Sequence, residues 1–166
     1  MAYIIRLATE NDLPQILQIY QSARQFMAEN GNPTQWSDSY PQPELVSEDL
    51  RSDSLYVCAD ADTLLAVFYY SRQVEEDYLQ IFDGNWLNDE PYGVIHRLAV
   101  AKPGLGIAAH CLNYGFSRCG NLRIDTHADN IPMQRTLAKN GFKRCGIIHC
   151  RYGGDRIAYQ KTGVSK

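Results

Sequence analysis

The sequence has no apolar run near the roughly 18 residues that a transmembrane helix needs, so we expect no membrane partner. Neither sign of charge dominates, because 16 Lys and Arg residues stand against 19 Asp and Glu residues. The resulting net charge is −3, whereas proteins that bind nucleic acid usually carry an excess of positive charge. We therefore expect no nucleic acid partner. The first six residues lack a charged leader and a small-residue cleavage site, which predicts a cytoplasmic protein.

Cysteine is present but unpatterned. The five cysteines are an odd number and contain no C-x-x-C pair, which argues against a disulfide framework. The nearest group of metal-ligand residue types is Cys145, His149 and Cys150, but adjacent His and Cys are poorly spaced for one ion. We expect buried thiols and no metal, with a redox or metal-binding protein as an alternative.

The length of 166 residues suffices for a full hydrophobic core. We find no repeat, low-complexity stretch or linker, so residues 1–166 are expected to form a single domain. Strands are expected over residues 3–7, 54–59, 64–70, 93–100, 122–126, 142–150 and 156–161, and helices over residues 11–29, 44–51, 107–119 and 130–140. This order predicts an α/β fold with a mixed sheet and helices on both faces.

Two local signals surround the first helix. Thr9 and Asp12 resemble a capping box at its start. After it, residues 33–43 carry three prolines beside Trp36 and Tyr40, which predicts an aromatic loop over a neighbouring surface.

A glycine-rich loop, residues 102–106, follows the strand over 93–100 and precedes a helix. The first backbone N–H groups of a helix have no intrahelical partner, and Gly104 and Gly106 let the backbone approach an anion closely. The loop has neither the Gly-Lys-Ser/Thr ending of a Walker loop nor the context of a dinucleotide fingerprint. On its own this motif fits a plain turn equally well.

Three motifs in order along the chain carry a family resemblance. Residues 5–13 look like a first strand entering a first helix, and residues 98–100 followed by 104–108 look like a central strand and a pyrophosphate loop. Asn130 lies twelve residues before Phe142 of a Gly-Phe pair, as in a final acetyl-CoA motif. In these motifs the chain resembles the GNAT superfamily of N-acetyltransferases.

The resemblance implies a GNAT-like acyl-CoA N-acyltransferase fold and transfer of an acetyl group from acetyl-CoA, as co-substrate, to an amine in a ternary complex. Dimers are common in proteins that resemble this one, so a homodimer is one option. The implied cofactor-binding residues are Leu98, Ala99, Val100, Gly104, Leu105, Gly106, Ile107, Ala108 and Asn130. Backbone N–H groups near residues 98–100 would stabilise the oxyanion.

The chain departs from the family pattern at two functional positions. Pro103 stands where Gln or Arg is usual, in a loop about two residues shorter, so pyrophosphate binding depends on residues 104–108. Leu137 stands where many members have the tyrosine that protonates the thiolate. Another acid or solvent must then serve, and Tyr152, Tyr159 and Cys145 are candidates that also fit packing roles.

His96 is the candidate general base. An amine must lose a proton before it attacks, and imidazole titrates near neutral pH. His96 also stands three residues before Ala99, where arylalkylamine-type members of the superfamily show a histidine. A histidine packed on a strand is the competing interpretation. Asp125 and His127 are second candidates, although a capped strand end explains them as well.

The acceptor side is expected to be acidic and aromatic. Six acidic residues and no Lys or Arg lie within residues 75–90, and the aromatic candidates are Trp36, Tyr40, Trp86 and Tyr92. These groups favour an ammonium substrate such as a polyamine, an arylalkylamine or a peptide amine. We expect a small-molecule or peptide amine as acceptor; the alternative is a non-catalytic acyl-CoA sensor of the same fold.

Overall fold

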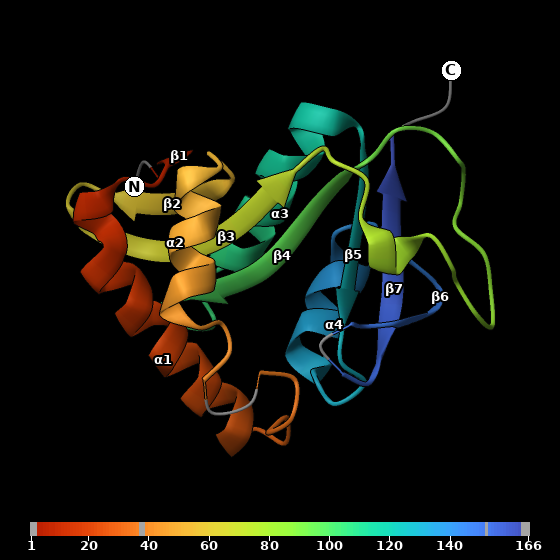
Figure 1. Ribbon diagram of the computed structural model, residues 1–166, viewed down its shortest axis with the longest axis horizontal. Helices are drawn as coiled ribbons and strands as arrows, with labels where there is room; N and C mark the ends of the chain where they lie inside the picture. The colour runs from red at the N-terminus through yellow and green to blue at the C-terminus, as the bar shows by residue number, and fades with distance from the viewer. Residues whose placement is uncertain (1–2, 37–38, 152, 164–166) are drawn as a thin grey trace.

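The computed structural model describes residues 3–36, 39–151 and 153–163, which contain one mixed sheet of seven strands (Figure 1). The strand order is β1-β2-β3-β4-β5-β7-β6, and only the neighbours β4 and β5 are parallel. The strands are β1 (Ile4–Leu7), β2 (Leu55–Asp60), β3 (Thr63–Ser71), β4 (Gly93–Val100), β5 (Asn121–Thr126), β6 (Lys143–His149) and β7 (Asp155–Thr162).

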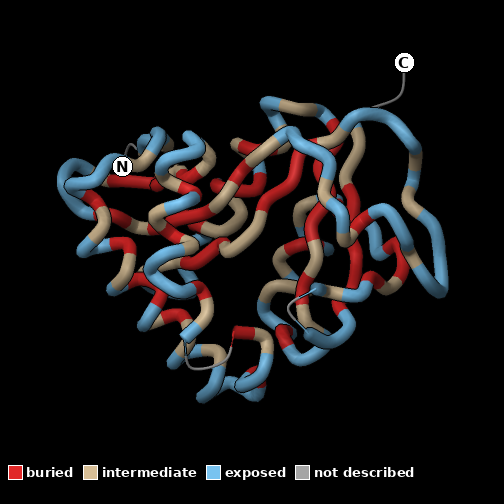
Figure 2. The backbone as a smooth tube through the Cα atoms, in the orientation of Figure 1, coloured by how far each residue is buried: buried red, intermediate tan, exposed pale blue. Residues whose placement is uncertain are grey.

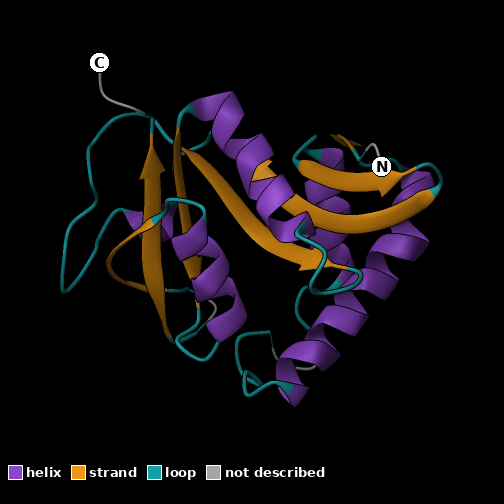
Figure 3. Cartoon of the chain, turned by 180° about the vertical axis from the view of Figure 1, so that it is seen from behind, coloured by secondary structure: helices purple, strands orange, loops and turns teal. Residues whose placement is uncertain are grey.

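Helices cover both faces of the sheet, as the sequence predicted (Figures 1 and 3). One face carries α1 (Leu13–Glu29) and α2 (Pro43–Arg51), and the other carries α3 (Ile107–Cys119) and α4 (Ile131–Lys139). Within the described part of the chain, no helix is long and apolar enough to cross a membrane.

Each face of the sheet has its own hydrophobic core, and the buried segments follow the central strands (Figure 2). Ile16 and Tyr20 of α1 pack with Val67 of β3 on one face. Cys111 and Leu112 of α3 pack with Ile95 of β4 on the other. The two cores hold β4 from both sides, so the position of its backbone is fixed.

The main difference from the expected elements lies in the acidic stretch. A short 3-10 helix, η2 (Glu76–Tyr78), interrupts the connection between β3 and β4, and the side chain of Tyr78 is buried. No periodic apolar pattern marks this turn. Tyr78 anchors it to the sheet through long-range contacts, which a local sequence pattern does not contain.

The capping box predicted at Thr9 and Asp12 is confirmed at a 3-10 turn, η1 (Glu10–Asp12), that leads into α1. The backbone N–H of Thr9 donates to Asp12 Oδ2 at 2.8 Å. Arg6 adds two hydrogen bonds to the same carboxylate, at 2.7 and 3.0 Å. The Arg6 bonds, opposed by burial and helped by Thr9, hold the pKa of Asp12 below its ordinary value.

We expect Asp12→Asn to lower the free energy of unfolding at pH 7 by about 1–3 kcal/mol, because the charged bonds to Arg6 are lost. A carboxylate with a depressed folded-state pKa stabilises the fold above its unfolded pKa, near 4, and stops doing so as pH falls through the folded value. Urea unfolding of both proteins should therefore show a constant gap above about pH 5 that closes below pH 4. Glu10→Gln, in the same turn but exposed, is the control; an equal loss there would contradict the role of Asp12.

Candidate active site

The sheet opens between β4 and β5. The two strands pair only at Gly93 with Leu122 and at Val94 with Arg123, and beyond these pairs they diverge (Figure 1). The rest of β4 therefore has a free edge toward the gap. Backbone N–H groups along that edge are available to a ligand.

A bulge in β4 shapes this edge. Val67 and Tyr69 of β3, two residues apart, face Ala99 and His96 of β4, which are three residues apart. The extra residue lies at Arg97, whose φ of 53° is left-handed and unusual for a residue with a side chain.

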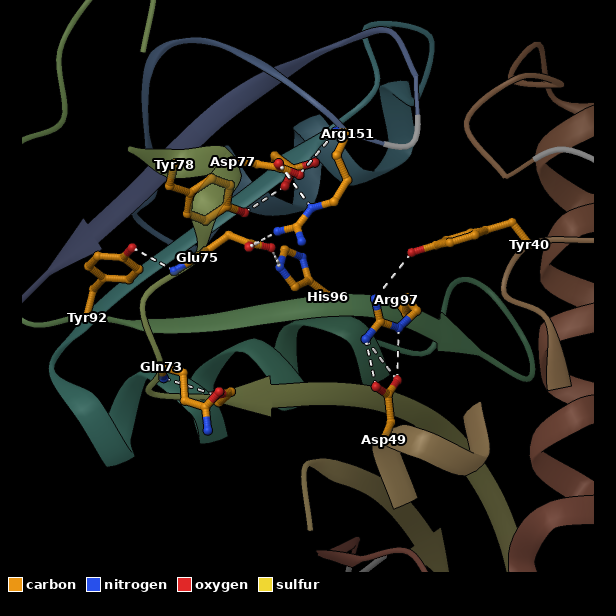
Figure 4. A network of polar contacts seen from close by, with 12 residues as sticks. Tyr40, Asp49, Gln73, Glu75, Asp77, Tyr78, Tyr92, His96, Arg97 and Arg151 are labelled. Carbon is orange, nitrogen blue, oxygen red and sulfur yellow. Dashed lines mark hydrogen bonds and ion pairs between the residues drawn. The ribbon is translucent and has the colours of Figure 1, made fainter. Parts of the chain in front are cut away.

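The Arg97 side chain stabilises this bulge. Its guanidinium donates to both oxygens of Asp49 on α2, each at 2.9 Å, and to the Tyr40 hydroxyl at 3.2 Å (Figure 4). The hydroxyl of Tyr20 on α1 donates to the Arg97 carbonyl at 2.9 Å. Helices on one face of the sheet thus hold the strained residue in place. Sequence reasoning did not find this network, because its members are far apart in the chain.

A first cleft, with a volume of about 560 Å³, lies at the start of α3. Gly106 caps the helix with φ 74°, and Gly104 has φ 85°, so both positions require the left-handed freedom of glycine. The loop and the first turn of α3 line the cleft with backbone N–H groups that no helical bond uses. Lys102 and Lys139 add positive charge at its wall.

Most residues implied for the cofactor line this first cleft; they are Leu98, Val100, Gly104, Leu105, Gly106, Ile107, Ala108 and Asn130. Ala99 is the exception, because its side chain points to the other face and packs in the core with α1. Pro103 also lines the cleft without an N–H to donate. The donors present and the adjacent lysines fit a pyrophosphate group.

Asn130 lies where α4 begins. Its Oδ1 accepts from the backbone N–H of Met133 at 3.2 Å, and its Nδ2 donates to Gln35 Oε1 at 3.1 Å. These bonds make Asn130 the N-cap of α4 and a link to the loop after α1. Its contribution to a ligand site is therefore to fix the end of the helix as well as to line the cleft.

The second cleft, of about 370 Å³, lies on the other side of the opening and contains His96. The two clefts adjoin, since both are lined by Met27, Leu98, Asn130 and Met133. A group held in the first cleft can thus meet a group held in the second beside the bulge of β4.

His96 lies in a charged chain of contacts in this second cleft (Figure 4). Its Nε2 is 2.7 Å from Glu75 Oε1, and the other Glu75 oxygen accepts from Arg151 at 2.7 Å. Burial disfavours the ionised Glu75 carboxyl, but His96 and Arg151 outweigh it and keep the pKa of Glu75 below its ordinary value. An ionised carboxylate only accepts, so Nε2 carries the hydrogen, and the lone pair of the neutral ring lies on Nδ1.

The second candidates for the base differ in position. Asp125 lines the second cleft, where its Oδ2 accepts from the Tyr78 hydroxyl at 2.6 Å. His127 lines neither cleft. Its Nδ1 accepts from the backbone N–H of Asp129 at 3.0 Å, and its Nε2 is 3.3 Å from the Thr34 hydroxyl, so it belongs to the turn after β5.

The acidic and aromatic candidates divide into two groups. Trp36, Tyr40, Glu75 and Asp77 line the second cleft. Trp86 and Tyr92 do not line it; their rings enclose the guanidinium of Arg123 at 4.2 and 4.0 Å. The other acidic residues of the stretch, Glu76, Asp83, Asp89 and Glu90, also lie outside this cleft.

The candidates for the thiolate acid line neither cleft where they are described. Tyr159 and Cys145 are buried, and Leu137 is a fully buried core residue of α4. Tyr152 lies outside the described residues. Among the residues that the structure describes, no group of three or more His, Cys, Asp or Glu side chains could hold a metal ion.

A mixed sheet that splays between β4 and β5, with a glycine loop and a helix N-terminus at the opening, defines an acetyltransferase fold of the GNAT type. A GNAT-family acetyltransferase from Streptococcus agalactiae is 31% identical, with 98% of this chain and 96% of that chain covered and a TM-score of 0.90. An acetyltransferase structure from Staphylococcus aureus is 30% identical, with coverages of 96% and 98% and a TM-score of 0.70. The chain belongs to the GNAT family of acetyltransferases.

More distant similarity concerns the fold alone. A chain of the NatC complex bound to Gag peptide and CoA is 13% identical, with 99% of this chain and 100% of that chain covered and a TM-score of 0.66. Neither a scan against models of protein families nor a search of curated proteins finds a match.

Proposed function

We propose that the protein is an N-acetyltransferase that moves the acetyl group of acetyl-CoA to a primary amine of a small molecule or peptide by direct attack in a ternary complex. The observation that carries this proposal is the meeting of the two clefts at the β4 bulge. CoA as the carrier is supported by the N–H groups and lysines of the first cleft, and by its presence in the NatC complex, which has a similar fold.

His96 takes the proton of the acceptor amine, and Glu75 holds the ring in the tautomer that can accept it. The neutral amine nitrogen then forms a bond to the acetyl carbon. The free backbone N–H groups of β4 at the opening stabilise the negative oxygen of the tetrahedral intermediate. As the carbon–sulfur bond breaks, the amide nitrogen releases its second proton to solvent and the thiolate takes a proton from solvent. Of the described candidates for the thiolate acid, neither Tyr159 nor Cys145 lines a cleft.

The test combines calorimetric titration with acetyl-CoA and with CoA, and a thiol-release assay over a panel of amines. Binding and turnover on any amine are the expected result. Binding with no turnover would favour a non-catalytic acyl-CoA sensor, and no binding would refute the assignment of the first cleft.

Replacing Asn130 with alanine should raise the KM for acetyl-CoA several-fold, because the start of α4 is no longer fixed beside the first cleft. Loss of the N-cap should also lower the free energy of unfolding by about 1 kcal/mol. The acidic limb of the kcat profile should not change, because His96 is still present in this variant. Steady-state kinetics and urea unfolding check these effects, with the exposed Asn113→Ala on α3 as control; an unchanged KM would refute the cofactor role of Asn130.

A further inference from the structure

Arg156, at the start of β7, lies in the wall of the second cleft. The residue is only 8% exposed. It makes three hydrogen bonds, all to backbone carbonyls, namely those of Gly153, Asp155 and Gln35 at 3.2, 3.2 and 3.3 Å. A guanidinium has five N–H donors, so at least two of them have no partner among the residues that the structure describes.

Two other arginines with little exposure have their charge compensated. Arg97 forms an ion pair with Asp49, and Arg123 is enclosed by the rings of Trp86 and Tyr92. Arg156 has neither an acidic partner nor an aromatic ring among the described residues. Burial of an ionised guanidinium without an anion is unfavourable, and arginine cannot relieve this by losing its proton. An anionic ligand in the cleft would compensate it.

The same cleft contains a carboxylate, Asp125, that has no positive partner within the described part of the chain. Asp125 of β5 faces Ala158 of β7, and Arg156 lies two residues before Ala158 on the same strand. Asp125 and Arg156 therefore lie on one face of the sheet, at diagonal positions. The ion pairs between described residues include none between Asp125 and Arg156. Asp125 accepts from Tyr78, a neutral donor, because burial and the Asp125 carboxylate raise the pKa of Tyr78.

The remaining acids of the cleft are already paired. Glu75 contacts His96 and Arg151, and Asp77 contacts Arg151. The cleft thus offers one positive and one negative site to a ligand, Arg156 and Asp125. A purely cationic amine such as a polyamine would leave Arg156 uncompensated.

We infer that the acceptor is a zwitterionic amine, an amino acid or a short peptide with a free carboxylate, and that Arg156 binds the carboxylate. This inference rests on the proposed function, and it names the substrate class of the same site. The acceptor amine lies on the side of His96 and Asp125. The volume of about 370 Å³ gives room for an amino acid or a dipeptide.

Matched substrates test the inference directly. The twenty amino acids, their carboxamides and a set of dipeptides with free or amidated ends are offered with acetyl-CoA, and thiol release is followed. The expected kcat/KM for the best carboxylate exceeds that of its carboxamide by roughly 10²-fold or more. Free amino acids and dipeptides are assayed separately, and the comparison of their kcat/KM values shows which of the two classes is the substrate.

Substitution of the arginine supplies the second arm. Arg156→Gln should lower kcat/KM for the carboxylate substrate by roughly 10²-fold, mainly through KM, and leave the carboxamide unchanged. Arg156→Lys should recover part of the loss, because it keeps the charge without the bidentate geometry. Arg144→Gln removes an exposed charge on β6 and serves as the matched control. Thermal unfolding shows whether each variant folds.

The outcomes separate the two proposals. Transfer to an amine without an acidic group, with no dependence on Arg156, overturns the inference and leaves acetyl transfer intact. If no amine is acetylated, the binding of the same amino acids to the CoA complex is measured by calorimetry, for the protein with and without Arg156→Gln. Binding that depends on Arg156 would support the carboxylate site and refute only the transferase, whereas no binding would overturn the inference.

Discussion

Replacement of His96 by alanine should lower kcat by roughly 10²-fold or more at pH 7, since the amine then has no positioned base. The acidic limb of the kcat profile should flatten with it. The pKa of Glu75 lies below the ordinary value of a carboxyl group, so its titration does not produce a limb near neutrality. Rates measured from about pH 5 to 9 check this expectation.

Binding of CoA provides the control for His96→Ala, because His96 lines the second cleft and not the first. Its dissociation constant should stay the same in calorimetry. Glu75→Gln keeps the shape of the carboxyl and removes its charge, so it should lower kcat less and retain the acidic limb. An unaltered pH profile in His96→Ala would refute the assignment.

Replacement of Asp49 by alanine should lower the free energy of unfolding by about 3–5 kcal/mol, because it leaves the charge of Arg97 buried without its partner. The side chains of Arg97 and Asp49 are 10% and 6% exposed, so the ion pair is largely shielded from solvent in the folded protein. Arg97 has a left-handed φ, which is unfavourable for a residue with a side chain. Its hydrogen bonds to Asp49 and Tyr40 maintain this conformation, so the loss of Asp49 destabilises the bulge of β4.

Urea unfolding with a fitted slope measures the effect of Asp49→Ala. Glu48→Ala, an exposed carboxylate one residue earlier on α2, should change stability by less than about 0.5 kcal/mol. The pair Asp49→Leu with Arg97→Met removes both charges and should cost less than the sum of the single changes. Strict additivity would show that the ion pair does not hold the bulge.

Much of the fold was predictable because its signals are local. The strand over residues 93–100 was predicted with the bounds that β4 has, and the capping box at Thr9 and Asp12 was confirmed. The glycine loop over residues 102–106 does precede a helix, with Gly106 as its cap. Periodicity, caps and turn residues act over a few positions, which is why they can be read directly from the sequence.

The candidate site was predictable only in part. His96 stood out by residue type and by its place on the central strand, but its partner Glu75, 21 residues away, was only one of six acids in a stretch without pattern. Trp86 and Tyr92 were equally good candidates for the cleft by sequence. The structure instead places their rings around Arg123.

The sequence by itself determined the order of strands and helices, the glycine loop at the start of α3 and the histidine on β4. The tertiary structure alone decided which charges are compensated. Asp49 reaches Arg97 across 48 residues, and Gln35 reaches Arg156 across 121 residues without supplying a negative charge. The physical reason is that helix and strand propensities depend on neighbours in sequence, whereas the cost of a buried charge depends on which distant side chains the fold brings to it.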